Sequence, residues 1–429
     1  MSIEGRKKTD PPGYTLALRV HTPIERIDAR YRLWVLPRAK CHPSTLVLPG
    51  LPTQRSAQGG TIDLFRRSLG LLVMQTVIVI FAVVLGIFAL LLATGAGYQW
   101  CATWRDCRRF PPPGRLLRVN DRRTHIHATG EGTPTVLFES GMGASCLSWT
   151  LVQPAVAEFC RAVSYDRAGH GWSDPAQEPR TAQRIAQELH ALLNVAGVPG
   201  PYVLVAHSFG GYVSRAFAHL YRGEVAGMVL VDSIHPAEWE NPTPDQLMMV
   251  HVGLRYARIA AWLARFGVVR FCLARVAKGS PGLGLAAANA FGTRVSSTVE
   301  RIAGEIRKLP APVVPIVRGF WSQPKNFISL GQHVAALPVS AAQAAAAKSF
   351  GDLPMVVLSG DHHPAPYDEW QRDLAQLSSR GLQLLAGDCG HWIHLDRPEL
   401  VTEAIRQVVA AARPDLQTKS FAASGSVSD

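Results

Sequence analysis

Cysteine pairs of the kind that bind zinc are absent from this chain of 429 residues. Its seven cysteines are Cys41, Cys101, Cys107, Cys146, Cys160, Cys272 and Cys389, and no two are spaced as CxxC. The sequence therefore gives no support for a zinc site. Cys101 and Cys107 would form a disulfide only in an oxidising compartment, and elsewhere they would be free thiols.

Charged side chains are absent from Ser68 to Trp104, and the run LLVMQTVIVIFAVVLGIFALLLA, from Leu71 to Ala93, is almost entirely apolar. About 20 apolar residues span a bilayer, whereas a core helix of that length would carry a polar stripe. A cleaved signal peptide is disfavoured because 70 residues precede this long run. The sequence predicts one transmembrane helix over residues 71–94.

The net charge of +12 lies mainly before this segment, where residues 1–70 contain 12 Lys/Arg and 5 Asp/Glu. No aromatic-interleaved basic patch or nucleic-acid motif is present, which argues against a nucleic-acid partner. Attraction to anionic lipid head groups explains a basic tail more simply. Arginines flank the segment almost evenly, but export of the basic tail is unfavourable. We therefore expect the main domain on the non-cytoplasmic side.

Residues 1–70 read as a disordered basic tail, or as upstream sequence if the working chain starts at Met74. Residues 95–114, with Pro111 to Pro113, read as a stiff linker. Strand-like runs then alternate with helical patterns, which predicts an α/β fold with a mostly parallel sheet. The strand-like runs are RLLRVN, THIHA, TVLFE, AVSYD, YVLVA, GMVLVD and MVVLSG. Residues 115–235 and 351–413 form the two parts of this core, residues 236–350 an inserted helical cap, and residues 414–429 a disordered tail.

Ser208 follows the apolar run YVLVA and precedes the helical pattern GGYVSRAF. A strand, a tight turn and a helix are the context in which G-x-S-x-G presents a nucleophilic serine. Ala206 and Gly210 occupy the two positions that must be small. We therefore interpret Ser208 as a nucleophile rather than as a helix cap.

A serine hydroxyl needs a base, and His391 in GDCGHWIHLDRPELV is the best candidate because it follows Gly390 on a loop after LQLLAG. His394 is the competing histidine. An acid must orient the imidazole. Asp232 and Asp361 each close a strand-like run between the serine and the histidine, and the sequence does not choose between them.

Backbone N–H groups must stabilise charge that develops on the substrate oxygen. Phe209, directly after the serine, supplies one. Met142 is the candidate for the other, because Gly141 and Gly143 let the loop ESGMGASCLSW approach the substrate.

From about residue 111 to 413 the chain resembles the α/β-hydrolase family of serine-nucleophile enzymes. The motifs are TVLFESGMGAS, SYDRAGHGWSDP, YVLVAHSFGG, VAGMVLVDSIHP and GHWIHLDRPELV. The resemblance implies an eight-stranded sheet, a helical cap and no metal or organic cofactor. The chain has SGMG where many members have His-Gly, and the resemblance leaves the third triad residue open between Asp232 and Asp361.

These residues predict a hydrolase that cleaves an ester or thioester of a hydrophobic acyl group through an acyl-enzyme on Ser208. A serine argues against epoxide hydrolysis and dehalogenation, which use an aspartate on this scaffold. Carbon–carbon bond hydrolysis and perhydrolysis use the same triad and remain open. The alternative from another class is a membrane-anchored binding protein that kept the fold without catalysis.

Overall fold

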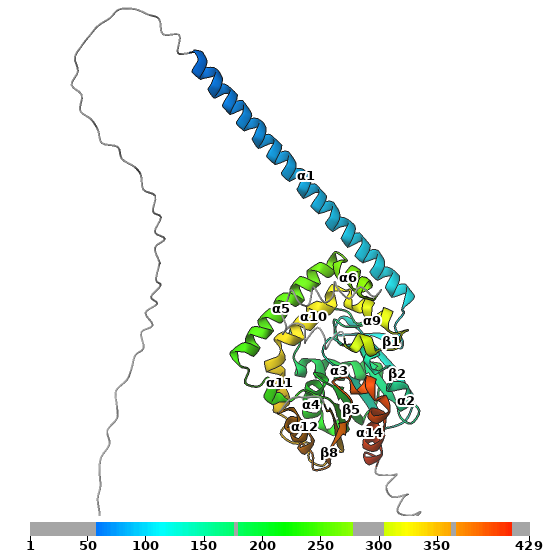
Figure 1. Ribbon diagram of the computed structural model, residues 1–429. Helices are drawn as coiled ribbons and strands as arrows, with labels where there is room; N and C mark the ends of the chain where they lie inside the picture. Colours follow the sequence, from blue (N-terminus) through cyan, green and yellow to red (C-terminus); the bar gives the residue numbers. More distant parts are fainter. Residues whose placement is uncertain (1–56, 176–178, 278–303, 362–365, 414–429) are drawn as a thin grey trace, which may run out of the picture. The chain divides into compact units, whose positions relative to one another are not determined.

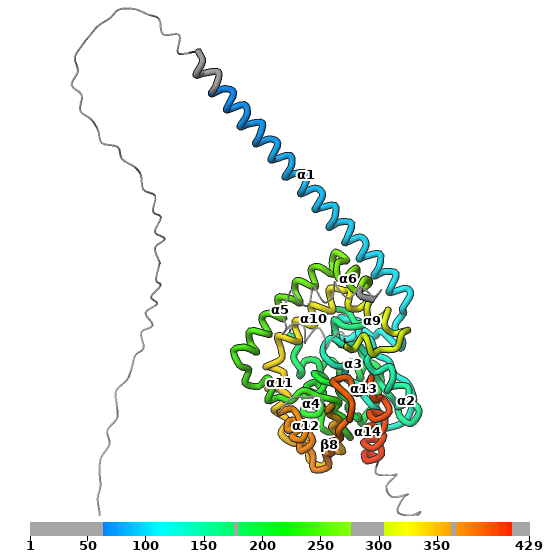
Figure 2. The backbone as a smooth tube through the Cα atoms, viewed as in Figure 1, coloured from blue at the N-terminus to red at the C-terminus, as the bar shows by residue number. Residues whose placement is uncertain are grey.

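The computed structural model describes residues 57–175, 179–277, 304–361 and 366–413. Most of the expected N-terminal tail, the expected tail at 414–429 and a central part of the expected cap lie outside these ranges. The chain divides into two units, Met1–Gln75 and Thr76–Asp429. The second unit contains the whole sheet (Figures 1 and 2).

Eight strands form a single sheet in the order β1-β2-β4-β3-β5-β6-β7-β8. They are β1 (Arg115–Val119), β2 (Arg122–Thr129), β3 (Thr135–Glu139), β4 (Ala162–Tyr165), β5 (Tyr202–His207), β6 (Val225–Val231), β7 (Met355–Gly360) and β8 (Gly381–Ala386). β2 pairs antiparallel with β1 and β4, and all other neighbours are parallel. Strands β3, β4, β5 and β7 are buried at every residue, and β6 at every residue except Ala226, as expected for a sheet covered on both faces.

Helices cover both faces of the sheet. One face packs against α3 (Ala182–Ala196), α4 (Gly210–Leu220) and α12 (Tyr367–Gln376), and the other against α2 (Gln153–Ala157) and α14 (Pro398–Ala411). Short segments η1 (Cys146–Trp149), η2 (Arg222–Glu224), η3 (Pro236–Glu238) and α13 (Ile393–Asp396) complete the core. The predicted strands and the α/β architecture are confirmed.

The described residues between β6 and β7 are mostly helical, as the expected cap requires. The labelled helices are α5 (Pro244–Arg265), α6 (Val268–Ala277), α9 (Val314–Trp321), α10 (Pro324–Ala335) and α11 (Leu337–Ala345). Thr243 starts α5 with a capping box, since its side chain accepts from the N–H of Gln246 while the Gln246 side chain accepts from the N–H of Thr243. Figure 1 shows α5 and α10 side by side, above the sheet.

The apolar helix α1 runs from Ala57 to Arg109 and is longer than expected at both ends. Its part from Asp63 to Arg109 is long and apolar enough to cross a membrane, and the most apolar window is not buried at all. The expectation of a linker over residues 95–114 is wrong for most of that range. No proline interrupts the helix before Pro111, and Gly95 lets it approach the backbone of Phe266 closely.

Phe217 on α4 is fully buried in the core, whereas Leu220 on the same helix is 37% exposed. We expect Phe217→Ala to lower the free energy of unfolding by about 3–5 kcal/mol, because a large cavity is left. Leu220→Ala should change it by less than about 1 kcal/mol. Urea unfolding of the chain in mild detergent, followed by tryptophan fluorescence, measures both. Equal losses in the two variants would contradict the observed packing of α4.

Candidate functional site

Ser208 lies on the turn between β5 and α4 with a φ of 53°, in the left-handed region that residues other than glycine rarely adopt. Its backbone is held by hydrogen bonds from its N–H to the carbonyl of Val231 at 3.2 Å and from Gly211 N–H to its own carbonyl at 3.0 Å. A Cβ on Gly210 would lie 2.6 Å from the Glu139 carbonyl oxygen, so this position requires glycine. Ala206 is completely buried, and the structure accommodates its methyl group. The turn thus has the strained geometry of a nucleophile elbow.

His391 lies on the loop between β8 and α13, and its side chain is 16% exposed. Its Nδ1 donates to Oδ2 of Asp232 at 2.6 Å. Asp232 directly follows β6, is fully buried, and its Oδ1 accepts from the N–H of Gly360 at 3.2 Å. The carboxylate is therefore fixed by backbone on one side and holds the imidazole on the other. Nε2 is left as the ring nitrogen available for proton transfer.

Asp361, the other acid candidate, is placed differently. Its Oδ2 accepts from the N–H of Asp388 at 2.7 Å, and its own N–H donates to the carbonyl of Cys389 at 3.2 Å. These bonds tie the end of β7 to the loop after β8. Of the two aspartates, the structure brings Asp232 to the ring of His391.

The competing histidine, His394, is completely buried, and its Nε2 lies 2.9 Å from Oγ of Ser148. Burial, and to a smaller extent the nearby His391, lower the pKa of His394 to about 3. A neutral ring enclosed in this way packs against its neighbours, while His391 retains contact with solvent.

His207, which the sequence did not single out, supports the His391 backbone. Its Nε2 donates to the carbonyl of His391 at 2.8 Å, and the two ring centroids are 4.6 Å apart. Burial holds the pKa of His207 well below its usual value, so the ring is neutral. Its position immediately before the serine was the signal that could have identified it.

The loop after β3 lies directly against the serine turn. A Cβ on Gly141 would be 2.8 Å from Nδ1 of His207 and 3.6 Å from Cβ of Ser208. Gly143 has a φ of +77°, which favours glycine. Within the described ranges, the N–H groups of Met142 and Phe209 have no hydrogen-bond acceptor in the protein. Both N–H groups are thus available to an oxygen in the site.

A buried ion pair holds the loop after β3 in place. Arg167 Nε donates to Oε1 of Glu139 at 2.6 Å, and Arg167 Nη2 donates to the carbonyls of Ser140 and Gly141, the latter at 3.0 Å. Burial raises the pKa of Glu139, and the charge of Arg167 opposes that rise. Because the guanidinium donates in several directions at once, one side chain fixes successive carbonyls of the loop.

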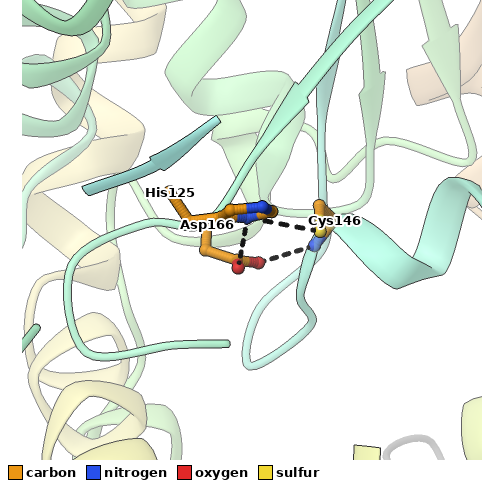
Figure 3. Close-up of side chains that lie close together, drawn as sticks. All are labelled: His125, Cys146 and Asp166. Atoms are coloured by element: carbon orange, nitrogen blue, oxygen red, sulfur yellow. Dashed lines mark hydrogen bonds and ion pairs between the residues drawn. The ribbon is translucent and has the colours of Figure 1, made fainter. Parts of the chain in front are cut away.

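A second buried cluster, His125, Cys146 and Asp166, anchors the far end of the same loop (Figure 3). Asp166 accepts from Nδ1 of His125 at 2.9 Å, from the N–H of Cys146 at 2.8 Å and from the N–H of Trp172 at 3.0 Å. The possible ligand atoms of the three residues lie within 4.8 Å of one another. Their hydrogen bonds connect β2, η1 and the segment directly after β4, which fits a structural role.

Two helices of the expected cap, α9 and α10, contact the loop after β3. A Cβ on Gly143 would lie 3.2 Å from the ring of Trp321 on α9 and 3.5 Å from Leu330 on α10. A small cavity lined by Gly143, Trp321 and Glu305, among others, lies here. Burial raises the pKa of Glu305 to about 7. Apolar cap side chains thus form one wall beside the candidate oxyanion loop.

The chain matches proteins whose fold is the one described above. The model of the alpha/beta hydrolase family matches residues 136–404. An uncharacterized vacuolar membrane protein of Saccharomyces cerevisiae is 32% identical over 106 residues, which cover 24% of this chain and 16% of that protein. The chain covers only 18%, 42% and 57% of the length of three other curated relatives.

Among solved structures, the enol-lactonase from Burkholderia xenovorans is 18% identical with a TM-score of 0.50, over 69% of this chain and 100% of that one. A haloalkane dehalogenase loop variant from Bradyrhizobium elkanii is 19% identical with a TM-score of 0.53, over 71% of this chain and 98% of that one. At these identities the likeness shows the fold alone. The family model, however, spans more than half of the sequence, and the chain belongs to the alpha/beta hydrolase family.

Proposed function

We propose that this protein is a serine hydrolase that cleaves a carboxylic ester or thioester through an acyl-enzyme on Ser208. Membership of the family supports hydrolysis as the reaction class. The observation that carries the finer proposal is the 2.6 Å hydrogen bond between His391 and Asp232, at the sheet edge where Ser208 sits on its strained turn.

In the proposed first step, Oγ of Ser208 attacks the substrate carbonyl carbon while Nε2 of His391 takes the hydroxyl proton. Asp232 stabilises the imidazolium that forms. The N–H groups of Met142 and Phe209 donate to the oxyanion. Collapse of the tetrahedral intermediate breaks the bond to the leaving alcohol or thiol, which receives the proton from His391.

In the second step, a water molecule attacks the acyl-enzyme, and His391 takes the proton of that water. The tetrahedral intermediate then releases the carboxylic acid, and His391 returns a proton to Oγ of Ser208. The same donors stabilise the second oxyanion, so the cycle regenerates the free enzyme and consumes one water.

A hydrophobic acyl group fits the surroundings of the loop. Trp321 and Leu330 approach Gly143 from the cap and provide an apolar wall. The candidate membrane span in α1 would hold the enzyme close to hydrophobic substrates. That the catalytic domain lies on the non-cytoplasmic side stays a prediction.

The nucleophile can be tested with a fluorophosphonate probe on the full chain in mild detergent. We expect wild type to be labelled and Ser208→Ala to lose all labelling, because the probe reacts with an activated serine hydroxyl. Ser214→Ala, which removes a buried hydroxyl of the adjacent helix, is the matched control and should keep its labelling. Absence of labelling in folded wild type would contradict a serine hydrolase and favour a binding protein.

The acid can be tested by comparing Asp232→Asn with Asp361→Asn on p-nitrophenyl esters. Asp232→Asn should lower kcat by about 10⁴-fold, because an amide favours the wrong tautomer of His391. Asp361→Asn should change kcat by less than about tenfold, since Oδ2 of Asp361 accepts from the N–H of Asp388 and helps to hold the loop after β8. The opposite order, or similar mild losses in both, would show that Asp232 is not the acid.

A further inference from the structure

The last turns of α1 leave the apolar segment and pack against the cap helices α6 and α9. A Cβ on Gly267 would lie 2.7 Å from the Tyr98 ring, and Gln99 Nε2 donates to the carbonyl of Ser322 at 2.8 Å. A Cβ on Gly319 would lie 3.2 Å from Oδ2 of Asp106. All of these residues belong to one structural unit. The candidate span therefore continues directly into a surface of the hydrolase domain.

A cavity of about 620 Å³ lies where α1, α6 and α9 meet. It is lined by five arginines and one acidic residue: Arg105, Arg108, Arg109, Arg270, Arg318 and Asp106. The volume is within the ordinary range for small-molecule sites. Leu273 and Pro315 add apolar surface to the wall. The lining thus combines an excess of positive charge with apolar patches.

In the part of the chain that the structure describes, Asp106 forms an ion pair with just one of these arginines. Arg270 pairs with Asp106 at 2.5 Å and also donates to Gln99 Oε1 at 3.0 Å and to Thr103 Oγ1 at 3.3 Å. Arg270 therefore holds α6 against α1.

The other guanidinium groups keep their charge available to a ligand. Arg108 lies over the ring of Trp104, 3.8 Å from its centroid. Within the described ranges, Arg105 and Arg318 form no ion pair with an acidic side chain. Planar guanidinium groups with free N–H donors are suited to bidentate binding of phosphate.

Exposed aromatic and apolar side chains place this cavity at the level of lipid head groups. Tyr98, Trp100 and Trp104 on α1 are 45%, 71% and 47% exposed. Val268 and Phe271 on α6 are also exposed. Tyrosine and tryptophan gather at the boundary between a bilayer and water. Arg105, Arg108 and Arg109 follow these aromatic residues directly in the sequence, where the phosphates of a membrane surface would lie.

We propose that the cavity between α1, α6 and α9 binds the phosphate head group of an anionic phospholipid. A bare phosphate would fill only part of it, whereas a glycerophosphate with the start of its acyl chains would contact both the arginines and the apolar wall. The site is separate from Ser208, and the inference does not depend on the proposed catalysis. Its effect is to attach the cap helices to the membrane surface through a bound lipid.

The test is binding of fluorescent phosphatidylglycerol to the full chain in a neutral detergent. Because each arginine near an anionic surface contributes about 1 kcal/mol, the double variant Arg105→Gln/Arg318→Gln should bind about thirtyfold more weakly. The matched control is Arg372→Gln/Arg380→Gln, which removes two exposed arginines of the hydrolase core that do not line the cavity and should change affinity by less than about twofold. Ala274→Trp, which fills the cavity without altering charge, should also weaken binding.

Competition experiments with two other compounds identify the class of ligand. Phosphatidylcholine, which has a phosphate but no net charge, should compete weakly, and inorganic phosphate should displace the lipid only at far higher concentration. Equal binding by wild type and the Arg105/Arg318 variant, with unchanged melting temperatures, would overturn the proposal. Displacement by inorganic phosphate at concentrations equal to those of the lipid would also overturn it, and would indicate a site for a soluble anion.

Discussion

Parallel strands bring the ends of β5, β6 and β7 to one edge of the sheet, and the hydrogen bond between His391 and Asp232 forms there. That bond requires two segments far apart in the sequence to meet with side chains correctly directed. The N–H of Gly360 fixes the carboxylate, and His207 fixes the backbone of the histidine. The candidate site therefore depends on the register of the sheet more than on any local sequence feature.

Buried charged side chains also position the candidate site, because they fix the loop after β3 beside Ser208. The pair of Arg167 and Glu139 holds the carbonyls of the loop after β3, and Asp166 holds the N–H of Cys146 at its far end. Removing one member of such a pair leaves an uncompensated charge in the interior. These groups make the loop rigid, and a rigid loop is what allows backbone N–H groups to stabilise a developing oxyanion.

Much of this arrangement was predictable because it is local. Continuous apolar runs marked the buried strands, and the strand, turn and helix around Ser208 marked the elbow. Asp232 and Asp361 could not be separated, since both follow parallel strands that end at the same edge and only long-range packing decides which side chain reaches His391. The extension of α1 was not predicted for a similar reason, because the apolar run ends at Ala93 and the contact between Gly95 and Phe266 joins residues far apart in the sequence.

The most direct test of the central claim is to trap the covalent intermediate. The full chain is quenched with acid during turnover of a p-nitrophenyl ester, digested, and examined by peptide mass spectrometry. The account predicts an acyl group on the peptide that contains Ser208 in wild type and no acylated peptide in the Ser208→Ala variant. An adduct on an aspartate, or steady turnover with no adduct on Ser208, would contradict it.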